Sequence, residues 1–262
     1  MRYALKVYYD GRGFYGSQIQ PDKRTVEGEL LRALRKFGIE PGNFQGAART
    51  DRGVSALGNV YALDSPREPI PKAVNSFLPR DVRVLGGARV GEDFHPRREA
   101  MEKTYKYFFL DRGYSLEGMR RAARVYEGVH SFHNYCRKED RDPVRRVASI
   151  EVERQGDVLV LIFTGESFLW EMVRRMVTAI RRAGEGKASI EELERSLSRS
   201  VKRKYPPSPP EGLVLWRIRY GFDFAEEEYS KKRLGKDLLR RIESRRILTA
   251  LDEAIYRELE TR

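Results

Sequence analysis

A carboxylate between two arginines is the first candidate for chemistry in this sequence. Asp51 lies in the segment 48–54, Ala-Arg-Thr-Asp-Arg-Gly-Val, where Gly53 would let the backbone approach a ligand closely. A carboxylate in such a place can act as a nucleophile or as a general base. Because most Arg-x-Asp triplets are surface salt bridges or turns, the segment by itself only nominates Asp51.

The composition gives no support for a disulfide, a metal site or a membrane-spanning segment. Cys136 is the only cysteine and only three histidines accompany it, so we expect neither a disulfide nor a thiolate metal cluster nor a zinc site. No run approaches the roughly 18 apolar residues that a membrane span requires, and residues 1–6 lack the apolar core of a signal peptide. We therefore expect a cytoplasmic protein that needs no metal or cofactor and does not associate with a membrane.

The charge balance indicates a polyanionic partner. Lysines and arginines number 51 against 39 acidic residues, which gives a formal net charge of +12. A folded chain this basic is expected to attract nucleic acid. A thermophile surface is the alternative, since 34% charged residues also suit ion-pair networks. Such networks are nearly balanced in sign, however, so we assign the positive excess to RNA or DNA.

The elements that must position Asp51 follow from hydrophobic periodicity and turn residues. Over the first part of the chain the patterns predict a strand over 3–9, a helix over 26–37 capped by Thr25, a strand over 60–63, a short helix over 73–77 and a strand over 82–85. This alternation is typical of a small α+β unit, with Asp51 in the loop before the second strand.

The next part of the chain repeats this rhythm. The patterns predict a strand over 104–110, a helix capped by Ser115, a hairpin of strands over 147–153 and 158–163, a helix whose apolar face runs from Leu169 to Ile180, a helix capped by Ser189 and a last strand over 213–218. The proline-rich run 206–210 breaks regular structure before that last strand.

The tail from about residue 224 differs in kind because it is dense in charge. Its large apolar residues recur at near-helical spacing from Leu238 to Leu259, so we expect one or two amphipathic helices that cover the core. A regulatory or partner-binding role is the alternative. The domain prediction is an N-terminal α+β half over 1–97 that carries the Asp51 loop, a C-terminal α+β half over 98–222 and a charged helical extension over 223–262.

The loop around Asp51 resembles the signature loop of the TruA family of tRNA pseudouridine synthases over residues 45–56, Gln-Gly-Ala-Ala-Arg-Thr-Asp-Arg-Gly-Val-Ser-Ala. Five further segments resemble that family in the same order along the chain. They are Tyr9-Asp10-Gly11 with Phe14-Tyr15-Gly16, residues 75–81, residues 93–97 with 103–107, residues 168–177, and residues 209–213. Six ordered matches over about residues 3–220 make the resemblance specific.

Four positions depart from the family pattern. Ala48 stands where the family loop usually has Gly, Arg52 where it has a small residue, and Ser55 where it has His. Ser17 stands at a position that is often held by Trp. Because Asp51 itself is kept, these departures bear on substrate contacts and not on the reaction.

The resemblance implies a fold and an activity. The fold would be two α+β halves, similar to RNA-recognition-motif or ferredoxin-like units, that share one mainly antiparallel sheet with the active site in the cleft between them. The activity would be that of an isomerase, which converts uridine to pseudouridine at positions 38 to 40 of the tRNA anticodon arm without a cofactor. Members of the family bind tRNA as homodimers, so we expect the same partners here.

The resemblance also assigns roles to individual residues. Asp51 would be the essential carboxylate, and Arg174 the cation that keeps it ionised in a closed pocket. Tyr105 would lie under the target base, which needs an aromatic face once it leaves the stack. Arg49 would enter the space that the flipped nucleotide leaves. The other substrate-binding candidates are Phe168 and Leu169 as an apolar wall and Arg52 and Arg97 as phosphate contacts, with Arg12, Lys23, Arg24 and Arg98 beside them.

Simpler interpretations of the same residues stay open. Arg174 could be a solvent-exposed arginine of a charged helix, and Tyr105 could be a core aromatic of its strand. The chain could be a non-catalytic RNA-binding protein, since β-α-β-β-α-β units also bind RNA through sheet aromatics, and Asp51 would then be expendable. A methyltransferase or nuclease is disfavoured, because no G-x-G-x-x-G follows the first strand and no carboxylate cluster for two metals is evident.

Overall fold

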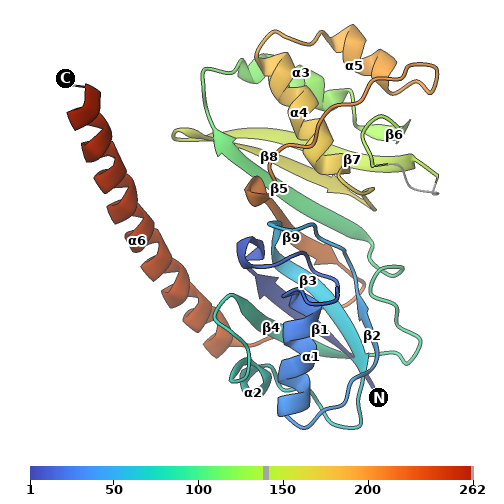
Figure 1. The fold of residues 1–262 in the computed structure, drawn as a ribbon. Helices are drawn as coiled ribbons and strands as arrows, with labels where there is room; N and C mark the ends of the chain where they lie inside the picture. The colour runs from blue at the N-terminus through green and yellow to red at the C-terminus, as the bar shows by residue number, and fades with distance from the viewer. Residues whose placement is uncertain (138–141, 261–262) are drawn as a thin grey trace.

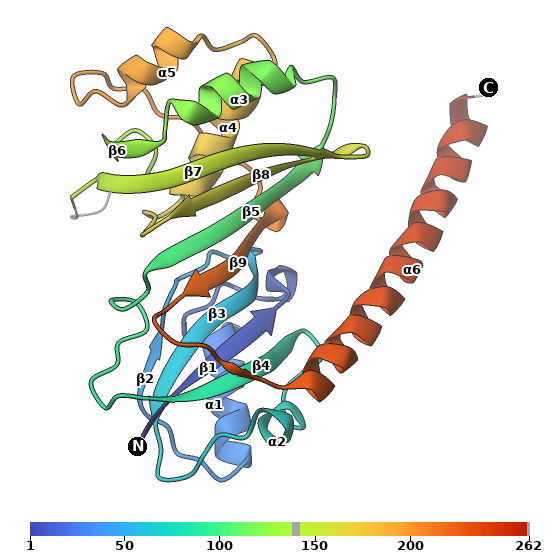
Figure 2. The same ribbon diagram turned by 180° about the vertical axis from the view of Figure 1, so that it is seen from behind.

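One mainly antiparallel sheet runs through the whole protein (Figures 1 and 2). The computed structural model describes residues 1–137 and 142–260. The ten strands of the sheet lie in the order β10-β4-β1-β3-β9-β5-β8-β7-β6, and β2 pairs with β3 beside this path. Among the described strands, only β3 and β9 pair in parallel. The predicted α+β class, with two parts that share one mainly antiparallel sheet, is confirmed.

The first half of the sheet carries the loop that contains Asp51. Its elements are β1 (Arg2–Tyr9), the 3-10 helix η1 (Gly11–Gly13), α1 (Val26–Lys36), β2 (Gly42–Gly46), β3 (Ser55–Asp64), α2 (Pro71–Asn75) and β4 (Val82–Val90). As predicted, Thr25 caps α1, and its side chain accepts a hydrogen bond from the Gly28 N–H. One face of α1 is fully buried and closes the core of the first half; its residues are Val26, Leu30, Ala33 and Leu34.

The second half of the sheet repeats the arrangement and carries Arg174. Its elements are β5 (Glu102–Leu110), α3 (Leu116–Arg124), β6 (Gly128–Ser131), β7 (Val144–Gln155), β8 (Val158–Gly165), α4 (Met172–Gly184), α5 (Ile190–Ser196) and the 3-10 helix η2 (Pro210–Gly212). Ser115 and Ser189 cap α3 and α5, as predicted. The apolar face of α4 is buried from Met172 to Ile180.

Strand β9 (Leu213–Arg219) joins the two halves. It pairs in parallel with β3, Ser55 opposite Val214, and antiparallel with β5, Tyr105 opposite Leu215. Because β3 begins directly after the Asp51 loop, this pairing brings that loop beside Tyr105. Figure 1 shows β9 in the middle of the molecule, between the two halves.

Some boundaries differ from the prediction because they depend on local geometry or on short pairings. The helix expected from Leu169 begins only at Met172. Glu171, the residue before it, has the left-handed conformation (φ 63°), so the helix cannot extend back to Leu169. Leu169 therefore lies in the β8–α4 loop. Strands β2, β6 and β10 (Ala225–Glu226) were not predicted, because each is short and polar or weakly alternating.

The charged tail forms one helix, α6 (Glu228–Glu260), of 33 residues. Only Ser230, Leu234 and Asp237 are buried, and residues 242–260 are exposed throughout. Figures 1 and 2 show α6 leaving the first half near β4 and running past the second half without lying against it. The prediction that this tail covers the core is thus wrong beyond its first three turns, because its apolar residues are spread around the helix. No described helix is both long and apolar enough to cross a membrane.

Candidate active site

Asp51 and Arg174 meet between the two halves of the sheet. Asp51 lies in the loop between β2 and β3, and Arg174 lies in the first turn of α4. The Arg174 Nη1 atom is 2.8 Å from Asp51 Oδ2, and the two side chains are 12% and 30% exposed. The predicted proximity is confirmed, and the alternative that Arg174 is a solvent-exposed arginine is wrong. A half-buried carboxylate that is paired with a cation is suited to nucleophilic or general-base chemistry.

Thr50 anchors the Asp51 loop to the first strand and its turn. The Thr50 Oγ1 atom lies 2.8 Å from the Tyr9 hydroxyl, inside the core. The Thr50 N–H donates to Ser17 Oγ at 2.9 Å, and the Ser17 N–H donates to the Thr50 carbonyl at 3.0 Å. Ser17, which departs from the family pattern, therefore holds the loop through its hydroxyl, which accepts a hydrogen bond that an indole, a donor only, could not accept.

Two glycines allow the chain to pack tightly around this loop. At Gly11 a Cβ atom would overlap the Val54 carbonyl oxygen, and the Gly11 N–H donates to Ser55 Oγ at 3.0 Å. Ser55, a second departure from the family pattern, is thus also a structural contact. Gly53 has a positive φ of 84° and lies against Pro210 and Glu211, so the close approach expected there is to the protein's own chain.

The proline-rich run after α5 fixes the Arg174 guanidinium. Arg174 Nε donates to the Ser208 carbonyl at 2.7 Å, and the Ser208 N–H donates back to the Arg174 carbonyl at 3.0 Å. Thr178, one turn further along α4, lies 2.8 Å from Ser208 through their hydroxyl oxygens. With Nε held by Ser208, the outer nitrogens of Arg174 face Asp51. The proline run therefore orients a candidate site residue as well as ending regular structure.

Trp170 is a site residue that the sequence analysis missed. Its indole Nε1 donates to Asp51 Oδ1 at 2.8 Å, while the side chain stays 42% exposed. The Arg137 guanidinium lies 4.2 Å from the centre of the indole ring. The only signal in the sequence was its place inside the 168–177 segment, next to Leu169 and four residues before Arg174.

Tyr105 and Phe168 form an aromatic wall beside the carboxylate. Tyr105 is 8% exposed, and its ring meets the Phe168 ring edge to face at 5.3 Å between centroids. Burial is the main reason why the pKa of Tyr105 is raised, and the nearby Tyr9 and Asp51 raise it further. The Tyr105 hydroxyl therefore stays protonated. Leu169 is buried in the same core. Tyr105 thus lies within the electrostatic reach of Asp51, and Phe168 lies against Tyr105; the roles of both in binding the substrate stay predictions.

Lys103 is a second site neighbour that was not predicted. Its Nζ donates to the Ala47 carbonyl at 3.0 Å, which ties β5 to the start of the Asp51 loop. The pKa of Lys103 is lowered to about 8, mainly by burial and to a smaller extent by the charge of Arg97. The charge of Arg97 also acts on Tyr105 and on Glu27, so the structure places Arg97 near the site, as predicted.

The other basic candidates are all exposed, and some of them form ion pairs with carboxylates of the protein. Arg49 is exposed, and Arg52 lies exposed with its guanidinium 4.4 Å from the centre of the Tyr15 ring, which also receives Lys23 at 4.9 Å. Two of the further phosphate candidates, in contrast, already have carboxylate partners. Arg12 pairs with Asp10, and Arg24 pairs with Asp81 and Glu29.

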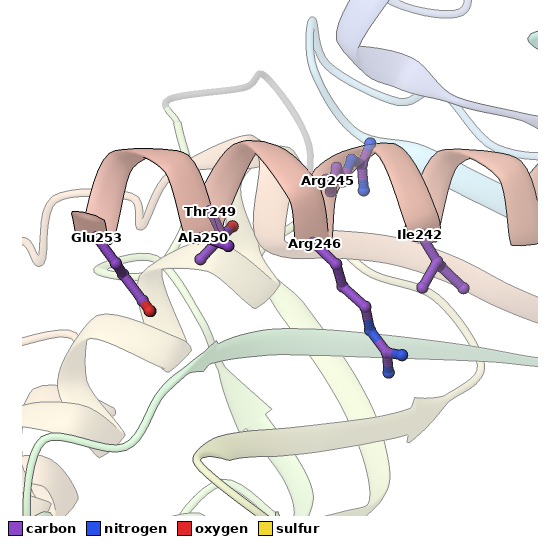
Figure 3. A pocket seen from close by; sticks show the side chains of 6 residues that line it. All are labelled: Ile242, Arg245, Arg246, Thr249, Ala250 and Glu253. Atoms are coloured by element: carbon purple, nitrogen blue, oxygen red, sulfur yellow. The ribbon is translucent and has the colours of Figure 1, made fainter. Parts of the chain in front are cut away.

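The described residues offer no second candidate for a catalytic or metal site. A shallow hollow of about 350 Å³ lies on α6 and is lined by Ile242, Arg245, Arg246, Thr249, Ala250 and Glu253 (Figure 3). One helix alone supplies all of its lining, so it has no opposing wall that could enclose a reacting group. Within residues 1–137 and 142–260, no three His, Cys, Asp or Glu side chains are grouped so that they could hold a metal ion.

Comparisons of the sequence agree with this constellation. A family profile described as tRNA pseudouridine synthase matches residues 122–221. The tRNA pseudouridine synthase A of Thermococcus kodakarensis is 48% identical over 251 residues, which cover 92% of this chain and 93% of the relative. The protein of the same name from Pyrococcus furiosus is 42% identical over 258 residues, and the match covers 97% of each chain.

Similarity to solved structures is weak. A chain of a Cbf5–Nop10–Gar1 complex is 14% identical, with a TM-score of 0.35, and the match covers 82% of this chain and 58% of that chain. The present chain therefore spans little more than half of that structure.

Proposed function

Since the chain belongs to the tRNA pseudouridine synthase A family, we propose that it is an isomerase that converts uridine to pseudouridine in tRNA. The observation that carries the proposal is the Asp51–Arg174 pair at 2.8 Å, which forms from two distant segments of the chain. We further propose, from the family resemblance, that the target uridines are those at positions 38 to 40 of the anticodon arm.

The reaction requires little beyond the groups that surround Asp51. The C1′–N1 glycosidic bond of uridine breaks, the base turns, and a C1′–C5 bond forms; C5 then loses its proton and N1 gains one. No atom is imported and nothing is oxidised. Asp51 supplies the carboxylate, as a nucleophile or as a base, and Arg174 pairs with it through Oδ2.

The aromatic and basic residues around the pair suit an extruded base. Tyr105 and Phe168 offer apolar faces beside the carboxylate, on which a base removed from its stack can rest. Arg49 is exposed beside Asp51, where its planar guanidinium can replace the flipped nucleotide. Arg52 and Arg97 would contact phosphates. We also propose that the enzyme acts as a homodimer in the cytoplasm, as the family resemblance implies.

A direct assay tests the proposal. Purified protein with EDTA should convert uridine to pseudouridine in an anticodon-arm transcript, and Asp51→Asn should abolish conversion while RNA binding stays within about twofold. Asp157→Asn, in the exposed β7–β8 turn, is the matched control and should keep full activity. Full activity in Asp51→Asn would contradict the assignment of Asp51. A wild-type protein that binds the transcript without modifying it would favour the non-catalytic alternative.

A further inference from the structure

Two donors of different kinds hold the Asp51 carboxylate. Arg174, a cation, donates to Oδ2 at 2.8 Å, and Trp170, a neutral donor, donates to Oδ1 at 2.8 Å. An ionised carboxylate offers about two acceptor directions on each oxygen, so each oxygen keeps one direction for substrate. With a single donor the carboxylate could turn about its broad Cβ–Cγ torsion. With two donors its plane is fixed.

The indole of Trp170 is itself held in place. The Arg137 guanidinium lies 4.2 Å from the centre of its ring, and the Arg137 N–H donates to the Trp170 carbonyl at 3.0 Å. The next residue, Glu171, has a φ of 63° and pairs with Arg175 at 2.5 Å, which fixes the turn into α4. A donor whose ring and backbone are both restrained is set in position before substrate arrives.

From this geometry we propose that Trp170 is a positioning residue, which aims the Asp51 carboxylate at the target nucleotide. Indole is a donor only and exchanges no proton at neutral pH, so it acts through Asp51 and not on the substrate. Being neutral, it adds a hydrogen bond without a second positive charge that would weaken the carboxylate as a nucleophile or base. This inference rests on the proposed function.

The partial exposure of Trp170 suggests a competing role with the opposite consequence. If the indole merely covered Asp51 until RNA displaced it, removal of its N–H would leave the chemical step unchanged or make it faster. A positioning residue instead contributes to the chemical step and leaves RNA affinity alone. Single-turnover rates and RNA affinities, measured separately, therefore distinguish the two roles.

The experiment compares Trp170→Phe, Trp170→His and Trp216→Phe on the anticodon-arm transcript. Trp170→Phe keeps a flat ring but removes the N–H, and should slow single turnover about tenfold, the effect of one lost hydrogen bond, with RNA affinity within about twofold. Trp170→His restores an N–H at the same place relative to Cγ and should recover most of the rate. Trp216→Phe, at the other tryptophan on β9, is the control and should behave as the wild type.

A second variant tests the contact that restrains the indole. Arg137→Ala should slow single turnover by a few fold in the wild-type background and have no further effect in Trp170→Phe, because it acts only through Trp170. Additive effects of the two substitutions would overturn that link.

The possible failures are distinguishable. If the wild-type protein converts no uridine, the proposed function fails. If the wild type is active and Trp170→Phe equals it, exceeds it, or loses only RNA affinity, then the inference about Trp170 fails and the proposed function stands.

Discussion

Arg174 Nη1 lies 2.8 Å from Asp51 Oδ2, although 123 residues separate the two in the sequence. The ion pair bridges the two halves of the sheet, since Asp51 precedes β3 and Arg174 lies in the first turn of α4. The Ser208 carbonyl holds the other side of the guanidinium at 2.7 Å. Arg174 therefore works through a fixed fork geometry as well as through its charge.

Replacement of Arg174 by lysine should separate charge from geometry. Arg174→Lys keeps a cation but cannot donate at the same time to Asp51 and to Ser208, so single turnover should slow by about 100-fold or more. Arg182→Lys, on the same helix, is the control and should change the rate less than about twofold. Near wild-type activity in Arg174→Lys would mean that charge alone suffices.

The buried amine of Lys103 predicts a pH-dependent stability. Burial and the charge of Arg97 hold its pKa at about 8, below its usual value of 10.5, so the unfolded chain binds this proton more tightly. Burial of the protonated Lys103 amine costs the folded state its full free energy below pH 8. This cost disappears as the pH rises towards 10.5, where the amine is neutral in the unfolded chain too. Relative to Lys103→Met, the wild-type free energy of unfolding should therefore increase over this range, by at most about 3 kcal/mol.

Urea unfolding of both proteins at pH 7.5 and pH 10 measures this difference. Lys36→Met, on the exposed side of α1, serves as the control and should show the same pH dependence as the wild type. A constant difference between wild type and Lys103→Met across this range would show that the amine is better solvated than its burial indicates.

The close approach of Gly11 to Val54 predicts that the Asp51 loop tolerates no side chain there. Gly11→Ala would place a methyl group on the Val54 carbonyl oxygen, which is backbone and can move only with the loop. We expect a loss of about 1–3 kcal/mol in the free energy of unfolding, together with loss of activity. Gly91→Ala, where no neighbouring atom lies within 4 Å, should leave both unchanged. A normal melting temperature for Gly11→Ala would contradict the packing.

The net charge of +12 predicts RNA binding that weakens steeply with salt. The exposed Arg52, stacked on Tyr15 beside Asp51, is a candidate phosphate contact. Arg52→Gln should lower the slope of log affinity against log salt concentration by about one. Arg35→Gln removes an exposed arginine that already pairs with Glu40, and should not change the slope. If the RNA affinity of the wild type did not change with salt concentration, the excess of positive charge would serve thermal stability instead.

The sequence by itself determined the local structure and the identity of the central carboxylate. Helix starts at Thr25, Ser115 and Ser189 were predictable, because a capping hydroxyl and an apolar repeat act over a single turn. Asp51 and Arg174 were predictable from the family resemblance of their segments. Both kinds of signal are contained in a few consecutive residues.

Tertiary structure decided which of these side chains meet and what supports them. The insertion of β9 between β3 and β5 brings the Asp51 loop beside Tyr105, and strand order is not encoded in any one segment. The contact of Trp170 with Asp51 depends on the left-handed turn at Glu171, and the burial of Lys103 depends on its neighbours. In α6, periodicity predicted a helix but not what covers it, because a helix forms through local hydrogen bonds whereas its burial requires a partner surface.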